Sequence, residues 1–314
     1  MEPGVYGEIS NSDYHSGPGI SKSGLDLIRR SPAHYQYAIS ADNDNQPTPA
    51  QQIGTAFHTL LLEPHLFDEQ YALPCEMPLD ALVTTDDLKA ALKECGEKVS
   101  GNKPELIERL KAVRPDVIIA DEIKQSYAVQ NAGRIIIPHE TNSQLWAMRE
   151  AVMAHPAASK LMSVPGKAEQ SVYWNDPVTG ELCRCRPDWW RDDDILVDVK
   201  TTEDASPEEF ARSILSWRYH VQDPFYTDGI FQAIGRVPRG FVFLVVEKKP
   251  PHAVAVYVLD RESRELGRAE YRADLNRYAE CKRTGVWPAY ADDIQPIGVP
   301  QWHLIRNADK LIAA

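Results

Sequence analysis

The segment ILVDVKT at residues 195–201 constrains the fold of this chain more than any other. It is predicted to be a β-strand, in which residues two apart point to the same side. Val197 and Val199 then face apolar packing, and Asp198 and Lys200 share the opposite face. A carboxylate and an ammonium on a half-buried strand are costly unless they bind something. The segment therefore predicts a strand that carries a functional site.

A second acid precedes this strand. A Pro-Asp pair, with Asp188 as its acid, ends a strand predicted over residues 181–188, and a further strand is predicted over residues 169–174. If the three strands form a meander, Asp188 comes close to Asp198. Neighbouring carboxylates repel each other, and a hard divalent cation such as Mg²⁺, which Mn²⁺ can replace, relieves that repulsion. We therefore expect a metal bound by Asp188, Asp198 and the backbone carbonyl of Val199.

Lys200 and Glu169 are the other charged groups expected near this metal. Lys200 would orient or deprotonate an attacking water, or steady the charge that develops on a phosphate. An isolated Asp-x-Lys is more often a surface salt bridge, but the apolar strand and the preceding Pro-Asp favour a site. Glu169 begins the predicted strand over residues 169–174, so it is either a further acid near the metal or a charge at the strand edge.

Two helical patterns place further polar groups on single helix faces. A helix predicted over residues 51–63 brings Gly54 and His58 onto one face. This spacing resembles the Gly-x3-His motif of RecB-like nucleases, which implies that the glycine allows close packing and that the imidazole is directed at the metal. Gln222 and Tyr226 are likewise spaced four apart in a helix predicted over residues 219–233. Pro224 lies between them and would kink this helix or delay its start.

The remaining pattern predicts an α/β protein. A turn is predicted at residues 189–194, a polar loop at 40–49, helices at 207–216 and 261–283, and strands at 240–247 and 252–259. Strands followed by crossover helices and further strands imply a sheet with helices packed on it.

Residues 84–114 interrupt this arrangement with two capped helices that contain few apolar residues. Their pattern of leucines around Gly101-Asn-Lys103 resembles a SAP motif, a helix–turn–helix element that binds duplex DNA. Helix N-termini and Lys103 suit a duplex phosphate. The alternative is a solvated hairpin or a packing element. The sequence therefore predicts one domain formed by residues 1–83 and 115–314, with an insertion at 84–114.

The motifs taken in chain order resemble a known nuclease family. His58 with the following Leu-Leu-Leu-Glu-Pro, Arg186-Pro-Asp188, Val197-Asp-Val-Lys-Thr-Thr and Gln222-x3-Tyr226 are similar to the nuclease domain of RecE-type exonuclease VIII. This is a RecB-like branch of the PD-(D/E)XK superfamily, whose core is a central mixed sheet flanked by helices. The resemblance implies that Gln222 and Tyr226 contact a DNA phosphate or the nucleophilic water.

The same resemblance implies an activity and partners. We expect a Mg²⁺-dependent exonuclease that degrades one strand of linear duplex DNA from 5′ to 3′ in phage or prophage recombination. Its expected partners are duplex DNA ends, a RecT-like single-strand annealing protein and further copies of the chain in a ring. Two alternatives stay open: another PD-(D/E)XK nuclease of endonuclease or repair type, or a non-catalytic DNA-binding module on a degenerate scaffold.

The amino-acid composition limits which functions and sites are possible. The net charge of −12, from 34 basic and 46 acidic residues, argues against a non-specific nucleic-acid coat. It leaves room for a local basic track, for which Arg184 and Arg186 beside the core hairpin are candidates. Five cysteines without a CxxC pair make a disulfide framework or zinc site improbable. No signal peptide or membrane span is expected, so we predict a cytoplasmic protein. The family resemblance implies that it comes from a bacterial cell and is encoded by a phage or prophage.

Overall fold

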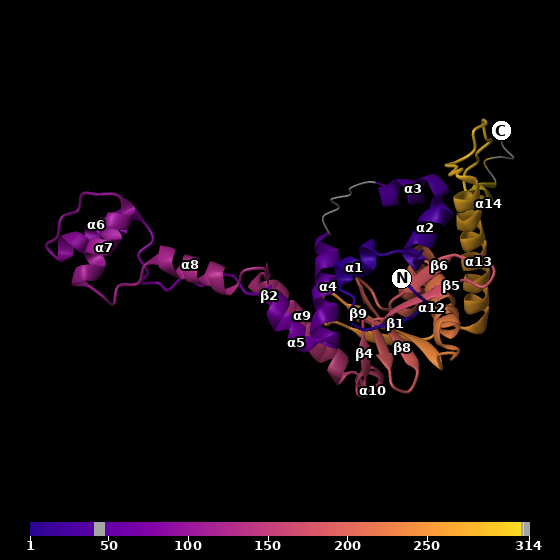
Figure 1. Ribbon diagram of the computed structural model, residues 1–314, viewed down its shortest axis with the longest axis horizontal. Helices are drawn as coiled ribbons and strands as arrows, with labels where there is room; N and C mark the ends of the chain where they lie inside the picture. The colour runs from indigo at the N-terminus through magenta and orange to yellow at the C-terminus, as the bar shows by residue number, and fades with distance from the viewer. Residues whose placement is uncertain (41–47, 309, 311–314) are drawn as a thin grey trace.

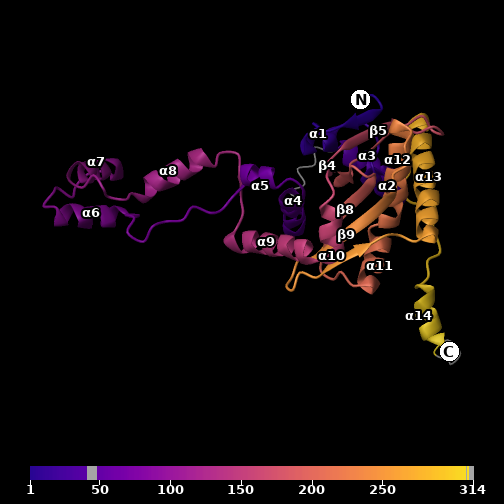
Figure 2. The ribbon, with the colours of Figure 1, turned by 90° about the horizontal axis from the view of Figure 1, so that it is seen from below.

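The computed structural model describes residues 1–40, 48–308 and 310, so most of the polar loop predicted at 40–49 lies outside the described residues. Figures 1 and 2 show a body built around β-strands and an arm that extends from it. No helix in the described part of the chain is long and apolar enough to cross a membrane. The body holds the chemistry-bearing residues, and the arm contains the predicted insertion.

The body is an α/β structure with a mixed sheet, as predicted. Its five strands lie in the order β10-β9-β8-β7-β4, and only the β8–β9 pair is parallel. A parallel pair needs a long crossover, which α11 and α12 supply. The strands are β4 (Gly166–Ala168), β7 (Trp189–Arg191), β8 (Ile195–Thr202), β9 (Gly240–Glu247) and β10 (Val254–Tyr257). The crossover helices are α11 (Pro207–Ser216) and α12 (Tyr219–Ile234).

The predicted meander is wrong, because its strands belong to two sheets. The first hairpin, β5 (Ser171–Asn175) with β6 (Leu182–Cys185), joins β1 (Gly4–Tyr6) in a separate three-stranded sheet. The predicted strand over residues 181–188 ends at Cys185, and Pro187 follows without an N–H to continue the ladder. Residues 189–191, predicted as part of a turn, form β7 and pair with β8. Asp188 therefore lies where the chain passes from one sheet to the other.

Two apolar clusters enclose β8 and β9. Val197 and Val199 pack into one cluster, and Leu196 packs into the other. Asp198 lies between Val197 and Val199 on β8 and opposite Phe243 of β9, and it is 1% exposed. Figure 2 shows α4 and α9 on one side of the strands and α12 and α13 on the other. Apart from α12, these helices are α4 (Pro49–Leu62), α9 (His139–Ala154) and α13 (Arg261–Thr284), and the short helix α10 (Pro156–Met162) follows α9.

The helix α12 runs without a break across Pro224. Proline removes the hydrogen bond to the carbonyl four residues earlier, which here belongs to His220. Gly267 of α13 lies directly against that carbonyl, and a Cβ at this glycine would stand 1.8 Å from the His220 oxygen. The lack of a side chain at residue 267 thus lets α13 pack closely on the start of α12.

The arm carries α6 (Thr85–Glu94), α7 (Lys103–Val113) and α8 (Ala120–Gln130). The first two helices share a small core of their own, built from Leu88, Ala91, Leu92, Leu106, Leu110 and Ile119. Leu82 and Ile119 pair where the chain enters and leaves this hairpin. The other elements are α1 (Asn11–Ser16), α2 (Lys22–Arg30), α3 (Pro32–Ser40), α5 (Pro64–Gln70), α14 (Gln301–Arg306), β2 (Tyr71–Ala72) and β3 (Ile135–Ile136).

Candidate active site

One cavity of about 620 Å³ collects most of the residues that the sequence singled out. Its wall is formed by α1, the start of α2, α4, β8 and α12. The candidate residues that line it are His58, Glu169, Arg186, Asp188, Asp198, Lys200, Gln222 and Tyr226. Val199, Arg184 and Lys103 are not among the lining residues.

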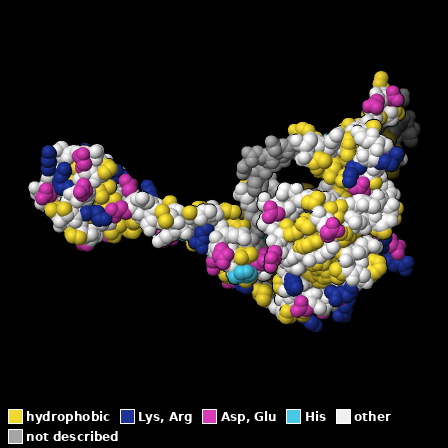
Figure 3. All heavy atoms as spheres, in the orientation of Figure 1, with side chains coloured by type: hydrophobic (Ala, Val, Ile, Leu, Met, Phe, Trp, Pro, Cys, Tyr) yellow, Lys and Arg dark blue, Asp and Glu magenta, His cyan; other side chains and the backbone are white. Residues whose placement is uncertain are grey.

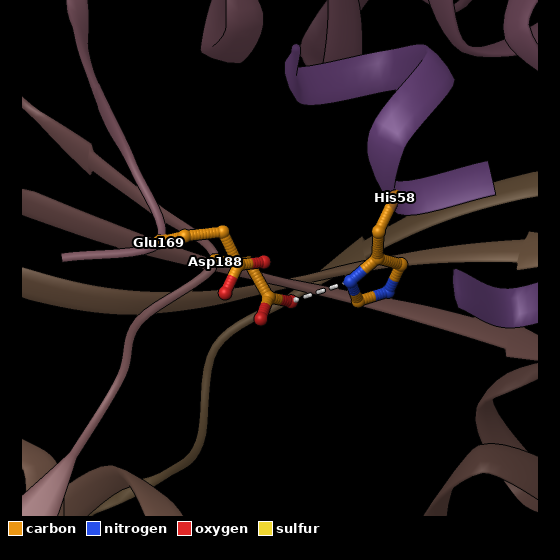
Figure 4. A group of neighbouring side chains, drawn as sticks. All are labelled: His58, Glu169 and Asp188. Carbon is orange, nitrogen blue, oxygen red and sulfur yellow. Dashed lines mark ion pairs between the residues drawn. The ribbon is translucent and has the colours of Figure 1, made fainter. Parts of the chain in front are cut away.

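Three of these side chains lie close enough together to hold one metal ion. His58, Glu169 and Asp188 each offer a ligand atom, and these atoms lie within 4.8 Å of one another. Figure 4 shows the imidazole and the two carboxyl groups converging from three separate elements. The two acids belong to segments that the backbone ties together, since the Glu169 N–H donates to the Asp188 carbonyl at 3.1 Å.

The backbone of Val199 orients two members of this group. Its N–H donates to Asp188 Oδ2 at 2.7 Å, and its carbonyl oxygen lies 2.9 Å from His58 Nε2. A carbonyl only accepts, so Nε2 carries the proton and Nδ1 has the free lone pair. Nδ1 lies 3.7 Å from Asp188 Oδ2, on the side of the three-residue group. The Val199 carbonyl, predicted as a metal ligand, accepts this hydrogen bond with one of its two lone pairs, and its role as a ligand stays a prediction.

Asp198 lies in the same cavity but has different partners. Its carboxylate contacts Lys200 Nζ at 2.5 Å and accepts a hydrogen bond from the Gln222 amide. Burial raises the pKa of Asp198, although the Lys200 charge opposes that rise. Asp198 is not a member of the three-residue group, which differs from the ligand set expected from the sequence.

Lys200 is charged at neutral pH in this environment. Burial lowers the pKa of Lys200, but the Asp198 and Asp188 carboxylates outweigh burial and raise it to about 12. A protonated amine donates and cannot accept a proton. Of the roles predicted for Lys200, the environment favours steadying negative charge over deprotonating a water.

Glu169 is held in an uncommon conformation next to Asp188. Its φ of 49° is in the left-handed region, which few residues other than glycine adopt. Burial and the Asp188 charge raise the pKa of Glu169 to about 8, and Arg186, 3.9 Å away, only partly offsets them. A bound cation stabilises the charged form of a carboxylate that is buried beside another acid.

Comparison with known proteins settles the family. A model described as "PDDEXK-like domain of unknown function (DUF3799)" matches residues 21–298. The chain belongs to this family. It therefore has the PD-(D/E)XK nuclease domain that the motifs predicted, and the matched range includes every residue of the cavity discussed above except those of the first twenty positions.

A solved structure agrees with this fold. A crystal structure of a "Putative exonuclease" from Eubacterium rectale aligns with a TM-score of 0.54 at 10% identity, over 95% of this chain and 96% of that chain. At this identity the likeness concerns the fold alone. The crystal structure of SSO0001 aligns over 74% of this chain and 88% of that chain at 12% identity, with a TM-score of 0.26 that is too low to support an argument. No curated protein matches the chain.

The cavity fits a divalent metal, which PD-(D/E)XK nucleases generally use. The three-residue group offers two carboxylates and one imidazole, and no cysteine belongs to it. Such hard and borderline donors suit Mg²⁺ or Mn²⁺. Cys183 and Cys185 lie two positions apart in the sequence, and both are buried in the apolar core and do not belong to this group.

The helix α12 presents Gln222 and Tyr226 to the cavity from one face, as their spacing predicted. The Gln222 amide is used by Asp198, and burial raises the pKa of Tyr226 far above its ordinary value, so its phenol is a donor at neutral pH. The packing role predicted for Gly54 is not required, because an added Cβ would meet only Thr201, at an ordinary 3.5 Å.

The structure gives the predicted phosphate-binding residues other partners. Arg184 is 8% exposed and donates to the carbonyls of residues 14, 15, 17 and 18, so its guanidinium holds α1 in place and faces no solvent track. Arg186 is also buried and donates to Ser171 and Ile9, although it lines the cavity. Lys103 pairs with Asp121 at 2.7 Å and donates to a backbone carbonyl. Each of these three side chains therefore has protein partners, and a role for it in DNA binding stays a prediction.

One residue that contacts the site without lining the cavity was not identified from the sequence. Tyr219, the first residue of α12, places its ring 4.7 Å from Lys200 Nζ. No spacing pattern could reveal this contact, because the ring reaches a strand that precedes it by a whole crossover helix.

Proposed function

We propose that this chain is a Mg²⁺-dependent exodeoxyribonuclease that degrades one strand of linear duplex DNA. The observation that carries the proposal is the grouping of His58, Glu169 and Asp188 beside the Asp198–Lys200 pair in one cavity. A metal next to a fixed ammonium is suited to phosphodiester hydrolysis, because both groups stabilise charge on the phosphate.

In this proposal Asp188, Glu169 and His58 hold the metal, and Asp198 is the neighbouring acid that can join them. The bound metal supplies Lewis acidity toward the phosphate and lowers the pKa of a water. His58 presents Nδ1, because the Val199 carbonyl holds the proton of the imidazole on Nε2. Lys200 stabilises the charge that develops on the scissile phosphate.

Gln222 and Tyr226 complete the proposed site from α12. The Gln222 amide fixes the Asp198 carboxylate, and the Tyr226 phenol is a hydrogen-bond donor that lines the same cavity. We assign the phenol to a DNA phosphate or to the attacking water. The buried carboxylate of Asp223 pairs with the partly exposed Arg264 at 3.0 Å, which joins α12 to α13 beside these residues and keeps the helix in position.

The arm is proposed to contact duplex DNA through its SAP-like hairpin. The hairpin has its own small core and extends from the body, which suits an element that reaches along a substrate. Figure 3 shows acidic and basic side chains mixed on the visible face of the arm. Its contribution is therefore expected to be modest, and to come from helix N-termini as well as from lysines.

The 5′ to 3′ polarity, the RecT-like annealing partner, the ring of further copies and the phage or prophage setting are proposed on the resemblance to RecE-type nucleases. They concern the biological task and not the chemistry of the cavity. An assay with duplexes labelled at the 5′ or the 3′ end on one strand separates the two polarities directly.

A single assay distinguishes the proposal from its alternatives. Purified protein with Mg²⁺ or Mn²⁺ is given linear duplex and covalently closed circular duplex of the same sequence. An exonuclease shortens only the linear form, an endonuclease also cuts the circle, and a non-catalytic module binds both without cleavage. Removal of the metal with EDTA should abolish cleavage in the first two cases.

A further inference from the structure

Two ammonium groups of the cavity lie against the same aromatic ring. Lys200 Nζ is 4.7 Å and Lys22 Nζ is 5.8 Å from the centre of the Tyr219 ring. Lys22 is the first residue of α2, and Lys200 lies on β8, so residues from three separate elements meet at this ring. Both lysines line the cavity. Tyrosine rings attract cations over their faces, so Tyr219 holds two like charges near each other.

The ring is mounted rigidly. Tyr219 follows Arg218, whose φ of 54° is in the left-handed region. The Arg218 guanidinium fixes this turn by ion pairs with Asp26 of α2 at 2.9 Å and with Glu270 and Asp274 of α13 at 3.0 and 2.6 Å. The ring itself lies against two core phenylalanines, Phe210 and Phe243. A strained backbone conformation that three carboxylates hold in place indicates a functional role for this turn.

Lys22 retains capacity for a ligand. Its ammonium contacts Asp26 at 2.7 Å and donates to the Trp217 carbonyl, which leaves one of its three N–H groups. Ser21 and Ser23 line the cavity beside it, at the N-terminus of the nine-residue helix α2. Free backbone N–H groups and the helix dipole favour an anion at this end. The surroundings of Lys22 therefore suit a phosphate.

We propose that Lys22 and Lys200 bind successive phosphates of one DNA strand, and that Tyr219 is the positioning residue that sets their spacing. Neighbouring phosphates of one strand advance by ~3.4 Å along the helix axis and also rotate about it, so they lie farther apart than this rise. Two ammonium groups at 4.7 and 5.8 Å from the centre of one ring are near enough to each other to meet one such phosphate each. Lys200 meets the scissile phosphate and Lys22 meets the next one. This inference rests on the proposed nuclease function and adds a second phosphate subsite to it.

The test compares five variants in the full-length protein: Lys22→Met, Lys200→Met, Tyr219→Phe, Tyr219→Leu and Lys282→Met. Lys282 is the matched control, because it also pairs with a carboxylate, Glu181, and lies 5.5 Å from the ring of Tyr278, but does not line the cavity. Binding of a fluorescent blunt duplex is measured in EDTA at several salt concentrations, and cleavage is measured with Mn²⁺. The unfolding midpoint of each variant is recorded in parallel.

We expect Lys22→Met to weaken duplex binding and to lower the salt slope by about 1, as the loss of one phosphate contact does, while Lys282→Met leaves both unchanged. Tyr219→Phe, which keeps the ring, should retain kcat, and Tyr219→Leu should reduce kcat at least 10-fold when both variants are assayed well below their unfolding midpoints. An unaltered salt slope in Lys22→Met, or equal kcat in the Phe and Leu variants, would overturn the inference. If the unmodified protein does not cleave DNA, the proposed function fails, whereas the salt slope still tests the Lys22 subsite.

Discussion

Asp188 Oδ2 accepts a hydrogen bond of 2.7 Å from the backbone N–H of Val199. Asp188 is thereby fixed to β8, the strand that carries Asp198 and Lys200. The Val199 carbonyl is at the same time 2.9 Å from His58 Nε2, so one peptide unit on each side of Val199 orients a metal-binding candidate. The site is built around the backbone of β8 as much as around its side chains.

This relationship predicts the effect of removing the imidazole. His58→Ala should weaken Mn²⁺ binding about 10- to 100-fold, because an oriented ligand is lost. Isothermal titration of the metal-free protein with Mn²⁺ measures this change. His34→Ala is the control, since His34 is hydrogen-bonded to Ser31 at 2.6 Å and does not line the cavity. Equal Mn²⁺ affinity in the unmodified protein and His58→Ala would remove His58 from the ligand set.

The raised pKa of Glu169 predicts a pH-dependent effect on stability. The carboxyl has an ordinary pKa of 4.5 and a pKa of about 8 in the fold, so the folded protein binds its proton more tightly than the unfolded chain. This group therefore reduces the free energy of unfolding progressively as pH rises from 4.5 to 8. In EDTA, Glu169→Gln should become more stable relative to the unmodified protein over that range. Urea unfolding at pH 5, 6.5 and 8 tests it, and a difference that does not change with pH would contradict it.

The hydrogen bond between Gln222 and Asp198 predicts a difference between two glutamines. Gln222→Ala removes a donor from a buried carboxylate and should lower the free energy of unfolding by about 1.5–3 kcal/mol. Gln144→Ala removes a bond of 2.7 Å to the neutral carbonyl of Lys248 and should lower it by only about 0.5–1.5 kcal/mol. Equal losses in urea unfolding would mean that the Gln222 amide does not stabilise a charged group.

The close contact between α12 and α13 predicts the effect of adding one methyl group. In Gly267→Ala the new Cβ would stand 1.8 Å from the His220 carbonyl oxygen, so the helices must separate. Overpacking of this kind costs about 1–3 kcal/mol of stability. Because α12 carries Gln222 and Tyr226, cleavage should fall as well. The control is Gly240→Ala, which adds a methyl group into open space and should leave stability and cleavage unchanged. Gly285→Ala is unsuitable as a control, because Gly285 has a positive φ.

The hairpin of α6 and α7, which is the outer part of the arm, can be removed and the chain rejoined by a short linker. The Leu82 N–H donates to the Ile118 carbonyl at 2.9 Å, so the ends of residues 83–118 lie side by side and a short Gly-Ser linker can replace them. If the arm contacts duplex DNA, the shortened protein should bind long duplex more weakly and with a smaller salt slope, while it still cleaves short duplexes. Unchanged affinity and salt slope would leave the hairpin a packing or assembly element.

The central strand and its helices could be predicted because their patterns are local. The alternation in residues 195–201 placed Asp198 and Lys200 on one face, and the four-residue spacing placed Gln222 and Tyr226 on one helix face. The resemblance of these motifs to a known family implied the PD-(D/E)XK domain, which the family match confirms. Periodicity thus predicted the helices and strands in which the pattern of apolar and polar residues repeats over at least one helical turn or several strand residues.

The division into two sheets could not be predicted in this way. The strands β1, β4 and β7 have three residues each, which is too short for an alternating pattern to emerge. The contact between His58 and Val199 joins residues 141 positions apart, and Tyr219 meets two lysines from other elements. These contacts depend on how elements pack, and packing leaves no signal in local spacing.

The measurement that tests the proposed function most directly is the digestion of a linear duplex labelled at one 5′ end, with Mn²⁺, by the unmodified protein, Asp198→Ala and Lys200→Met. The proposal predicts progressive release of labelled mononucleotides or short products by the unmodified protein, and none by Asp198→Ala. Lys200→Met should be slower by roughly 10²–10³, the usual effect of losing a positioned charge. Cleavage by Asp198→Ala at the rate of the unmodified protein, with both proteins folded, would contradict the assignment of this cavity as the active site.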